Sequence, residues 1–193
     1  MSSVSKGSAD RIVQLADENA LLRASLSDMR QRVAELEHVA DSDTVTPLPN
    51  RRRFLREIER VVGSANRHGT PSALVAIEIG NLRTINDLHG EMAGDAALIH
   101  VAKLLSGLIR STDFAARIDG DDFGLILDHL DHNSAIETAE RIARCIAANP
   151  LDIGSGSVAI KADVGVATIL PGDTADDVMR RAELNVGRAK SDY

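Results

Sequence analysis

Three carboxylates fall within four residues at Asp119–Asp122, and this turn is the part of the sequence best suited to chemistry. It lies between two apolar segments, 114–118 and 123–127, which predict a hairpin of two strands. The strand predicted over 73–79 carries another carboxylate, Glu78, near its end. Carboxylates on a strand end and a neighbouring hairpin tip suit Mg²⁺ bound with a nucleotide, because phosphates and water complete its octahedral shell. A solvated acidic turn is the alternative, since Asp and Gly are common in turns.

The elements that must position these carboxylates follow residue 40. Helices are predicted over 51–62, 94–110, 134–148 and 175–190, and strands over 73–79, 114–118, 123–127 and 158–169. The order of helices and strands predicts an α+β sandwich, with helices packed on a mostly antiparallel sheet.

The segment before this domain, residues 9–42, predicts a coiled-coil dimerisation helix. Residues 9–40 contain no Gly or Pro, and the apolar residues are spaced by alternating steps of three and four. The two sets of seam positions are Ile12, Asn19, Leu26 and Val33, and Leu15, Leu22, Met29 and Leu36. Asn19 favours a parallel two-stranded register, because its amide can be satisfied across the dimer axis. A single amphipathic helix lying on its own domain is the alternative.

Composition excludes several classes of protein. The 193 residues include 22 Lys and Arg against 29 Asp and Glu, a net charge of −7, which argues against a nucleic-acid coat. Aromatic residues make up only 2%, too few for a platform that stacks single-stranded bases. No segment approaches the roughly 20 apolar residues that cross a bilayer, and the Ser-rich residues 1–8 lack an apolar signal core. We expect a cytoplasmic protein without membrane insertion, a disordered segment over 1–8 and a globular domain over 43–193.

Segments of the globular domain resemble the GGDEF family, the diguanylate cyclases. Asp43–Arg52 is similar to the family's D-x-L-T-G-L-P-N-R-R opening. Four further segments match family motifs in the same order: Ile85–Asp87 (I-N-D), Gly94–Asp95 (G-H-x-x-G-D), Arg117–Phe123 (R-x-G-G-D-E-F) and Arg188–Lys190 (Y-x-A-K). The resemblance implies a ferredoxin-like, nucleotidyl-cyclase-like sandwich with a βαββαβ core and added helices. It also implies condensation of two GTP into the bacterial second messenger cyclic dimeric GMP, with each protomer of a dimer supplying one half-site.

The resemblance assigns roles at the signature end of the domain. Glu78 stands where the family has a metal-binding Asp, Ile79 offers a backbone carbonyl, and Asp121 stands at the second metal carboxylate. Asp121 and Asp122 occupy the catalytic positions of the signature. Mg²⁺ is therefore the implied cofactor whenever GTP is bound.

Four further residues match family positions that contact the nucleotide. Asn86 and Asp95 stand at the guanine-edge contacts, where a carboxylate beside an amide leaves adenine with unpaired groups. Arg83 and Lys190 stand at positions that face phosphates. From local sequence alone, Asn86 and Asp95 are also acceptable helix caps.

Departures from the family pattern cluster at the signature end. They are Pro47, Glu78, Gly80, Glu91, Asp119, Asp122 and Gly187. Asp119 replaces the first Gly of the signature, and its charge opposes a polyphosphate by about 4 kcal/mol at ~4 Å in a partly dry site. Gly80 replaces the second Asp of D-x-D, and Asp122 is one methylene shorter than the family's Glu. Because catalysis is sensitive to displacements of about 1 Å, these changes argue against efficient turnover.

A second constellation matches the family's product-binding inhibitory site. Arg110 and Asp113 have the spacing of its R-x-x-D motif, and Arg141 stands where the family can supply another arginine. Guanidinium groups suit this role, because they fork onto phosphate or guanine and stack on purines. A helix-end arginine with an aspartate cap is the alternative.

We therefore predict a homodimeric, degenerate GGDEF protein that binds cyclic dimeric GMP without catalysis and acts through a protein partner or a changed dimer arrangement. An active cyclase, with GTP as substrate and product inhibition, is one alternative. A coiled-coil scaffold without nucleotide function is the other.

Overall fold

The computed structural model describes residues 3–154 and 156–191, apart from some side chains near both ends, those of Ile12 and Lys190 among them. The chain divides into two units, Met1–Ala40 and Asp41–Tyr193. In the described part, no helix is both long and apolar enough to cross a membrane.

The N-terminal unit is helical. Helix α1 spans Ser3–Asp41, so residues 3–8, which we expected to be disordered, are helical instead. No proline precedes Pro47, and nothing in this segment stops the helix from extending toward its N-terminus. The described seam side chains of α1 are exposed in the single chain, namely Leu15, Leu22, Leu26, Met29, Val33 and Leu36. The coiled coil and the dimer remain predictions.

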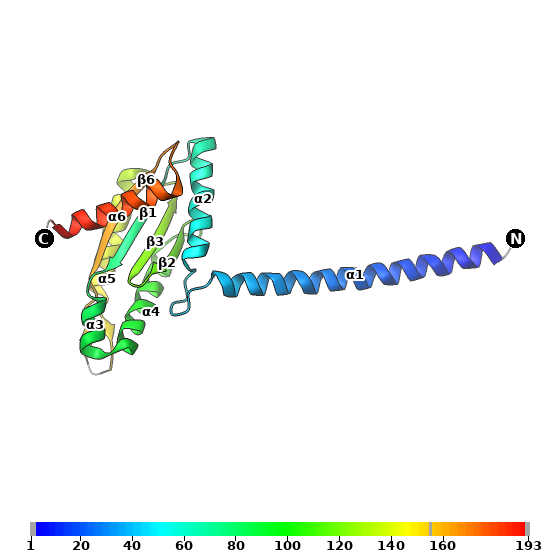
Figure 1. The fold of residues 1–193 in the computed structure, drawn as a ribbon, viewed down its shortest axis with the longest axis horizontal. Coiled ribbons are helices and arrows are strands. Elements are labelled where there is room, and N and C mark those ends of the chain that lie inside the picture. Colours follow the sequence, from blue (N-terminus) through cyan, green and yellow to red (C-terminus); the bar gives the residue numbers. More distant parts are fainter. Residues whose placement is uncertain (1–2, 155, 192–193) are drawn as a thin grey trace. The chain divides into compact units, whose positions relative to one another are not determined.

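An antiparallel sheet with the strand order β2-β3-β1-β6 forms the centre of the second unit (Figure 1). Its strands are β1 (Ser72–Ile79), β2 (Phe114–Asp119), β3 (Asp122–Asp128) and β6 (Ala162–Ile169). Two short strands, β4 (Leu151–Asp152) and β5 (Ser157–Val158), form a separate antiparallel pair. The predicted antiparallel α+β architecture is confirmed.

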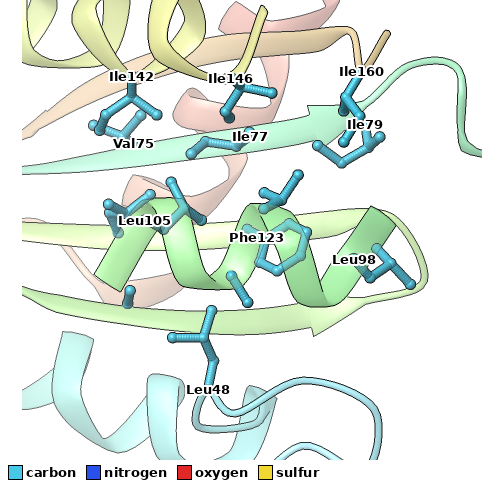
Figure 2. Close-up of a cluster of buried hydrophobic side chains, with 14 of the residues drawn as sticks. Leu48, Val75, Ile77, Ile79, Leu98, Leu105, Phe123, Ile142, Ile146 and Ile160 are labelled. Carbon is cyan, nitrogen blue, oxygen red and sulfur yellow. The ribbon is translucent and has the colours of Figure 1, made fainter. Parts of the chain in front are cut away.

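Helices cover both faces of this sheet. They are α2 (Arg51–His68), α3 (Leu82–His89), α4 (Glu91–Leu108), α5 (His132–Ala148) and α6 (Ala175–Ser191). Alternate residues of β1 and β3 pack against α4 and α5 to form one core. Figure 2 shows labelled members of that core: Leu48, Val75, Ile77, Ile79, Leu98, Leu105, Phe123, Ile142, Ile146 and Ile160.

The opposite face packs against α2 and α6. Phe54 of α2 lies across Gly124 of β3, where a Cβ would come within 2.6 Å of the ring. Gly165 of β6 lets the backbone of α6 approach closely, since a Cβ there would overlap the Ala182 carbonyl and the Val186 amide. These two glycines fix how α2 and α6 sit above the strands that carry the acidic residues.

The structure corrects two sequence predictions. The segment 158–169 is not a single strand, because the side chain of Asn81 accepts a hydrogen bond from the Lys161 amide (2.9 Å) and donates one to the Ala159 carbonyl (2.8 Å). These bonds hold residues 159–161 outside the ladder. Helix α3 was not predicted, because its eight residues bury only Ile85 and leave too short an apolar pattern.

Candidate functional site

The tip of the β2–β3 hairpin lies beside the end of β1. The Ile79 amide donates a hydrogen bond to the Asp121 carbonyl (3.0 Å), which ties the signature turn to the strand that carries Glu78. Gly120 has a φ of 33°, in the left-handed region that favours glycine, and its amide donates to Asp119 Oδ1 (2.9 Å). The structure therefore places the predicted tip and the predicted strand end together.

Three carboxylates from adjacent strands lie side by side at this end of the sheet, and we call them the acidic row: Glu78 of β1, Asp122 of β3 and Asp163 of β6. Glu78 is directly opposite Asp122 in the β1–β3 ladder and directly opposite Asp163 in the β1–β6 ladder. Residues directly opposite one another in antiparallel strands project from the same face. Asp163 was not among the predicted site residues, and no spacing in the sequence links it to Glu78.

The carboxylates in and around this acidic row repel one another. Burial and, after it, the negative charges of Asp121, Glu78, Asp119 and Glu183 together raise the pKa of Asp122 to about 6. A cleft of about 190 Å³ opens here and continues inward over apolar side chains. Its lining comprises Arg51, Phe54, Leu74, Ala76, Ile77, Glu78, Ile118, Asp119, Asp122, Phe123, Gly124, Met179, Glu183 and Val186. Four carboxylates and one arginine line the cleft, so its charge opposes an anionic ligand that arrives without a cation.

The donors predicted to bind a metal suit a hard cation. The carboxylates of Glu78 and Asp121 and the carbonyl of Ile79 offer the oxygen ligands that Mg²⁺ prefers, with phosphates and water left to complete its shell. Among the described residues, no three His, Cys, Asp or Glu side chains already form a metal centre. The chemistry of these donors fits Mg²⁺ that arrives together with a nucleotide.

The guanidinium group of Arg117 anchors the signature turn to the segment before α2. Its guanidinium donates to the Gly120 carbonyl from Nε (3.0 Å) and Nη2 (2.7 Å), and Nη1 lies 3.2 Å from Asp43 Oδ1. Asp43 also accepts from the amide (2.7 Å) and hydroxyl (2.8 Å) of Thr46. Burial alone would raise the pKa of Asp43, but the bonds from Thr46 and Arg117 outweigh it and lower that pKa. We did not predict this positioning role for Arg117.

Asn86, one of the two predicted guanine contacts, has an unusual environment. Its Oδ1 is buried and has no hydrogen-bond partner among the described residues. The side chain lies against Gly94, where any Cβ would overlap Asn86 Oδ1. Asp95 follows Gly94 on α4 and is exposed. The structure thus brings Asn86 beside the Gly94–Asp95 pair and leaves its buried Oδ1 without a hydrogen-bond partner in the described part of the chain.

The two predicted phosphate contacts are less defined. Arg83 is exposed on α3, and its Nε lies 3.9 Å from Asp87 Oδ2. Lys190 belongs to the last turns of α6, and its side chain lies outside the described residues.

Arg110, Asp113 and Arg141 line one small pocket at the other end of the hairpin. Asp113 Oδ2 accepts from the Arg110 amide (2.9 Å) and Oδ1 accepts from the Asp128 amide (3.3 Å). Arg110 and Arg141 are exposed, and neither guanidinium has an ion-pair partner among the residues described. The three residues of the predicted R-x-x-D site therefore line one pocket, and their role as a binding site remains a prediction.

Comparison with known proteins supports this description of the domain. The chain is 34% identical over 155 residues to the diguanylate cyclase TpbB of Pseudomonas aeruginosa, a match that covers 79% of this chain and 35% of TpbB. It thus spans about a third of the length of that curated relative, and 26% of the bifunctional diguanylate cyclase and phosphodiesterase MucR of the same species.

Two solved structures share the fold. The coiled coil and GGDEF domain of DgcB from Caulobacter crescentus, solved in complex with c-di-GMP, superposes with a TM-score of 0.81 at 27% identity and covers 93% of both chains. The diguanylate cyclase SiaD of P. aeruginosa superposes with a TM-score of 0.83 at 24% identity, over 98% of this chain and 73% of SiaD. The predicted nucleotidyl-cyclase-like fold is confirmed.

The family model described as "Diguanylate cyclase, GGDEF domain" matches residues 40–193, which include every residue of both sites. The chain belongs to the GGDEF family.

Proposed function

We propose that this chain is a non-catalytic receptor for cyclic dimeric GMP, bound through Arg110, Asp113 and Arg141. The observation that carries the proposal is the pocket in which all three residues meet, with both guanidinium groups free of ion-pair partners among the described residues. Ligand binding would be passed on through a protein partner or a changed dimer arrangement.

The contacts of Asp113 explain how the pocket is prepared for a ligand. Its two oxygens accept hydrogen bonds from the backbone amides of Arg110, before β2, and of Asp128, the last residue of β3. These bonds fix the loop before β2, so that little ordering is left to do when a ligand binds. Because the carboxylate of Asp113 accepts hydrogen bonds from backbone amides, both guanidinium groups remain available for phosphate and guanine.

The chemistry of the ligand matches these side chains. A cyclic dinucleotide presents two phosphates and two purines, and Arg binds phosphate through paired hydrogen bonds and stacks on flat rings. Support also comes from the DgcB structure, solved in complex with c-di-GMP, which matches 93% of this chain.

Calorimetry with cyclic dimeric GMP tests the proposal through two arginines of α5. Arg141 lines the pocket, whereas Arg144, one turn along the helix, lies 3.2 Å from Glu140. We expect Arg141→Ala to weaken binding at least tenfold and Arg144→Ala to leave it within twofold of the wild type. Absence of binding to the wild type, or equal effects of the two variants, would contradict the proposal.

An active cyclase is the second candidate, favoured by the buried acceptor of Asn86. A buried amide oxygen without a partner costs about 1–3 kcal/mol, which a guanine N–H group would offset. Mg²⁺ held by Glu78, Asp121 and the Ile79 carbonyl would neutralise the phosphates of GTP. Incubation with GTP and Mg²⁺, followed by chromatography of the products, separates the candidates: cyclic dimeric GMP formed by the wild type but not by Asp121→Ala establishes turnover.

We also propose that α1 pairs with a second copy of this chain as a parallel coiled coil. The seam predicted from the heptads is exposed in the single chain. The flanking charges agree with a parallel register, because Glu18 and Arg23 occupy positions that meet across such a dimer, and so do Arg32 and Glu37.

Sedimentation of two matched leucine variants tests this dimer. Leu26 occupies the seam and is 47% exposed, whereas its neighbour on the same helix, Leu21, lies outside the seam and is 70% exposed. We expect Leu26→Asp to shift the protein to monomer and Leu21→Asp to leave the dimer intact. A monomeric wild type, or dissociation by both variants alike, would contradict the dimer.

A further inference from the structure

Residues 128–131 join the last residue of β3 to the residue that caps α5, and we call them the β3–α5 link. The second residue of the link, His129, has a φ of 55°, which places a residue with a Cβ in the left-handed region. This conformation is disfavoured for most residues other than glycine, and it persists where the surrounding structure holds it. The contacts of the link must therefore fix its backbone.

The carboxylate of Asp128 makes the principal contacts. Its Oδ1 accepts one hydrogen bond from the His129 amide (3.0 Å) and another from the hydroxyl of Ser72 (2.9 Å), a residue that is only 1% exposed. One residue after His129, the Leu130 amide donates to the carbonyl of Pro71 (3.0 Å). The backbone on both sides of His129 is thus tied to the beginning of β1.

Both sides of the proposed ligand pocket are attached to this link. At its beginning, the Asp128 amide donates to one oxygen of Asp113, whose other oxygen accepts from the Arg110 amide. At its end, the side chain of Asp131 caps α5, the helix that carries Arg141. The shape of the link therefore sets the position of one pocket arginine relative to the other.

We propose that Asp128 is a positioning residue for the cyclic dinucleotide, because its carboxylate fixes the left-handed turn at His129 and thereby the separation between Arg110 and Arg141. The inference rests on the proposed receptor function and adds to it a residue outside the lining of the pocket. A ligand with two phosphates needs both guanidinium groups at a set spacing, and a link that is already fixed leaves less ordering to be done on binding. Asp128 acts through the backbone that it holds and need not touch the ligand.

Calorimetry with cyclic dimeric GMP tests this role through variants of the link. We expect Asp128→Ala to weaken binding at least fivefold, because both hydrogen bonds to its Oδ1 are lost. Asp128→Asn keeps an oxygen that can accept them, and the charge that it removes lies 3.8 Å from Arg60, so its affinity should stay within twofold of the wild type. The double variant Asp128→Ala/His129→Gly should also bind within twofold of the wild type, since glycine adopts the left-handed conformation without support.

Two controls separate positioning from a general loss of stability. Val62→Ala removes buried volume from α2 on the opposite face of the sheet, so it should lower the unfolding temperature and leave the affinity unchanged. Without ligand, the Arg110 amide should exchange its hydrogen with solvent faster in Asp128→Ala than in the wild type or in Asp128→Asn.

Three results would overturn the proposal: an Asp128→Ala variant that binds and exchanges like the wild type, an Asp128→Asn or double variant as weak as Asp128→Ala, or an equal loss of affinity in Val62→Ala. A wild type without affinity for cyclic dimeric GMP would overturn the receptor function instead. The exchange of the Arg110 amide, which needs no ligand, would then still decide whether Asp128 fixes the link.

Discussion

The two ends of the β2–β3 hairpin differ in the charge they offer a nucleotide. At the tip, Asp122 has a pKa raised to about 6 by its burial and by the carboxylates around it. At the base, the carboxylate of Asp113 accepts hydrogen bonds from backbone amides, and Arg110 and Arg141 have no ion-pair partner in the part of the chain that the structure describes. We therefore expect phosphates to need an added cation at the tip, whereas we expect the arginines at the base to accept them directly. One hairpin thus carries crowded carboxylates at its tip and two exposed arginines at its base.

We expect the largest effect on stability from removing the side chain that anchors the tip of the β2–β3 hairpin. The side chains of Arg117 and Asp43 are 13% and 15% exposed, and loss of the guanidinium removes the ion pair of Asp43 and both side-chain hydrogen bonds to the Gly120 carbonyl. Arg117→Met should lower the free energy of unfolding by about 3 kcal/mol in urea titrations. Arg60→Met serves as control, because Arg60 is 55% exposed beside Glu57 and should cost less than about 1 kcal/mol. Equal losses for both variants would mean that Arg117 does not hold the tip.

A second variant separates the two binding sites. A methyl group at Gly94 would overlap Asn86 Oδ1, so Gly94→Ala should weaken binding of GTP with Mg²⁺ at least tenfold and leave cyclic dimeric GMP binding unchanged. Gly107→Ala, on the same helix with open space around it, should change neither. Thermal shift assays with both ligands measure the difference. Unaltered GTP binding in Gly94→Ala would remove Asn86 from the guanine site.

The pH dependence of stability probes the acidic row. The pKa of Asp122 is higher in the folded than in the unfolded chain, so its contribution to stability falls as pH rises from about 4 to 6. Asp122→Asn should therefore stabilise the protein above pH 6, by about 1 kcal/mol after allowance for solvent screening. The difference in unfolding free energy between variant and wild type should vanish below pH 4. A difference that stays constant with pH would contradict the assigned repulsion.

The smallest effect is expected at Asp119. The sequence suggested a strong clash with phosphates, but the side chain is exposed and its charge is screened by solvent. Asp119→Gly should therefore tighten GTP binding by only about twofold in calorimetry. A gain of tenfold or more would show that this single replacement, rather than the whole acidic row, weakens the tip.

Local patterns were sufficient to predict most of the fold. The hairpin, β1 and α2 follow from the spacing of apolar residues, and the structure adds that the Asn50 side chain caps α2 by accepting from the Arg53 amide (3.1 Å). Helix α3 was missed because only Ile85 is buried on it. The segment after residue 158 was misassigned because Asn81, far away in the sequence, binds residues 159 and 161.

The candidate sites, like the fold, could be predicted only where local sequence determines them. Motif spacing predicted a site at Arg110, Asp113 and Arg141, and these three residues line one pocket of the structure. Asp163 could not be predicted, because its position beside Glu78 depends on the register between β1 and β6. The register between two strands determines which of their residues lie opposite one another, and the spacing of residues in the sequence does not reveal that register.

The most direct test of the account is calorimetry with cyclic dimeric GMP on the wild type, Arg110→Ala and Asp121→Ala. The two variants change opposite ends of the same hairpin, and both side chains lie outside the buried core. We predict that Arg110→Ala loses binding at least a hundredfold and that Asp121→Ala binds like the wild type. Normal binding by Arg110→Ala, or loss of binding by Asp121→Ala, would contradict the assignment of the ligand to the arginine end.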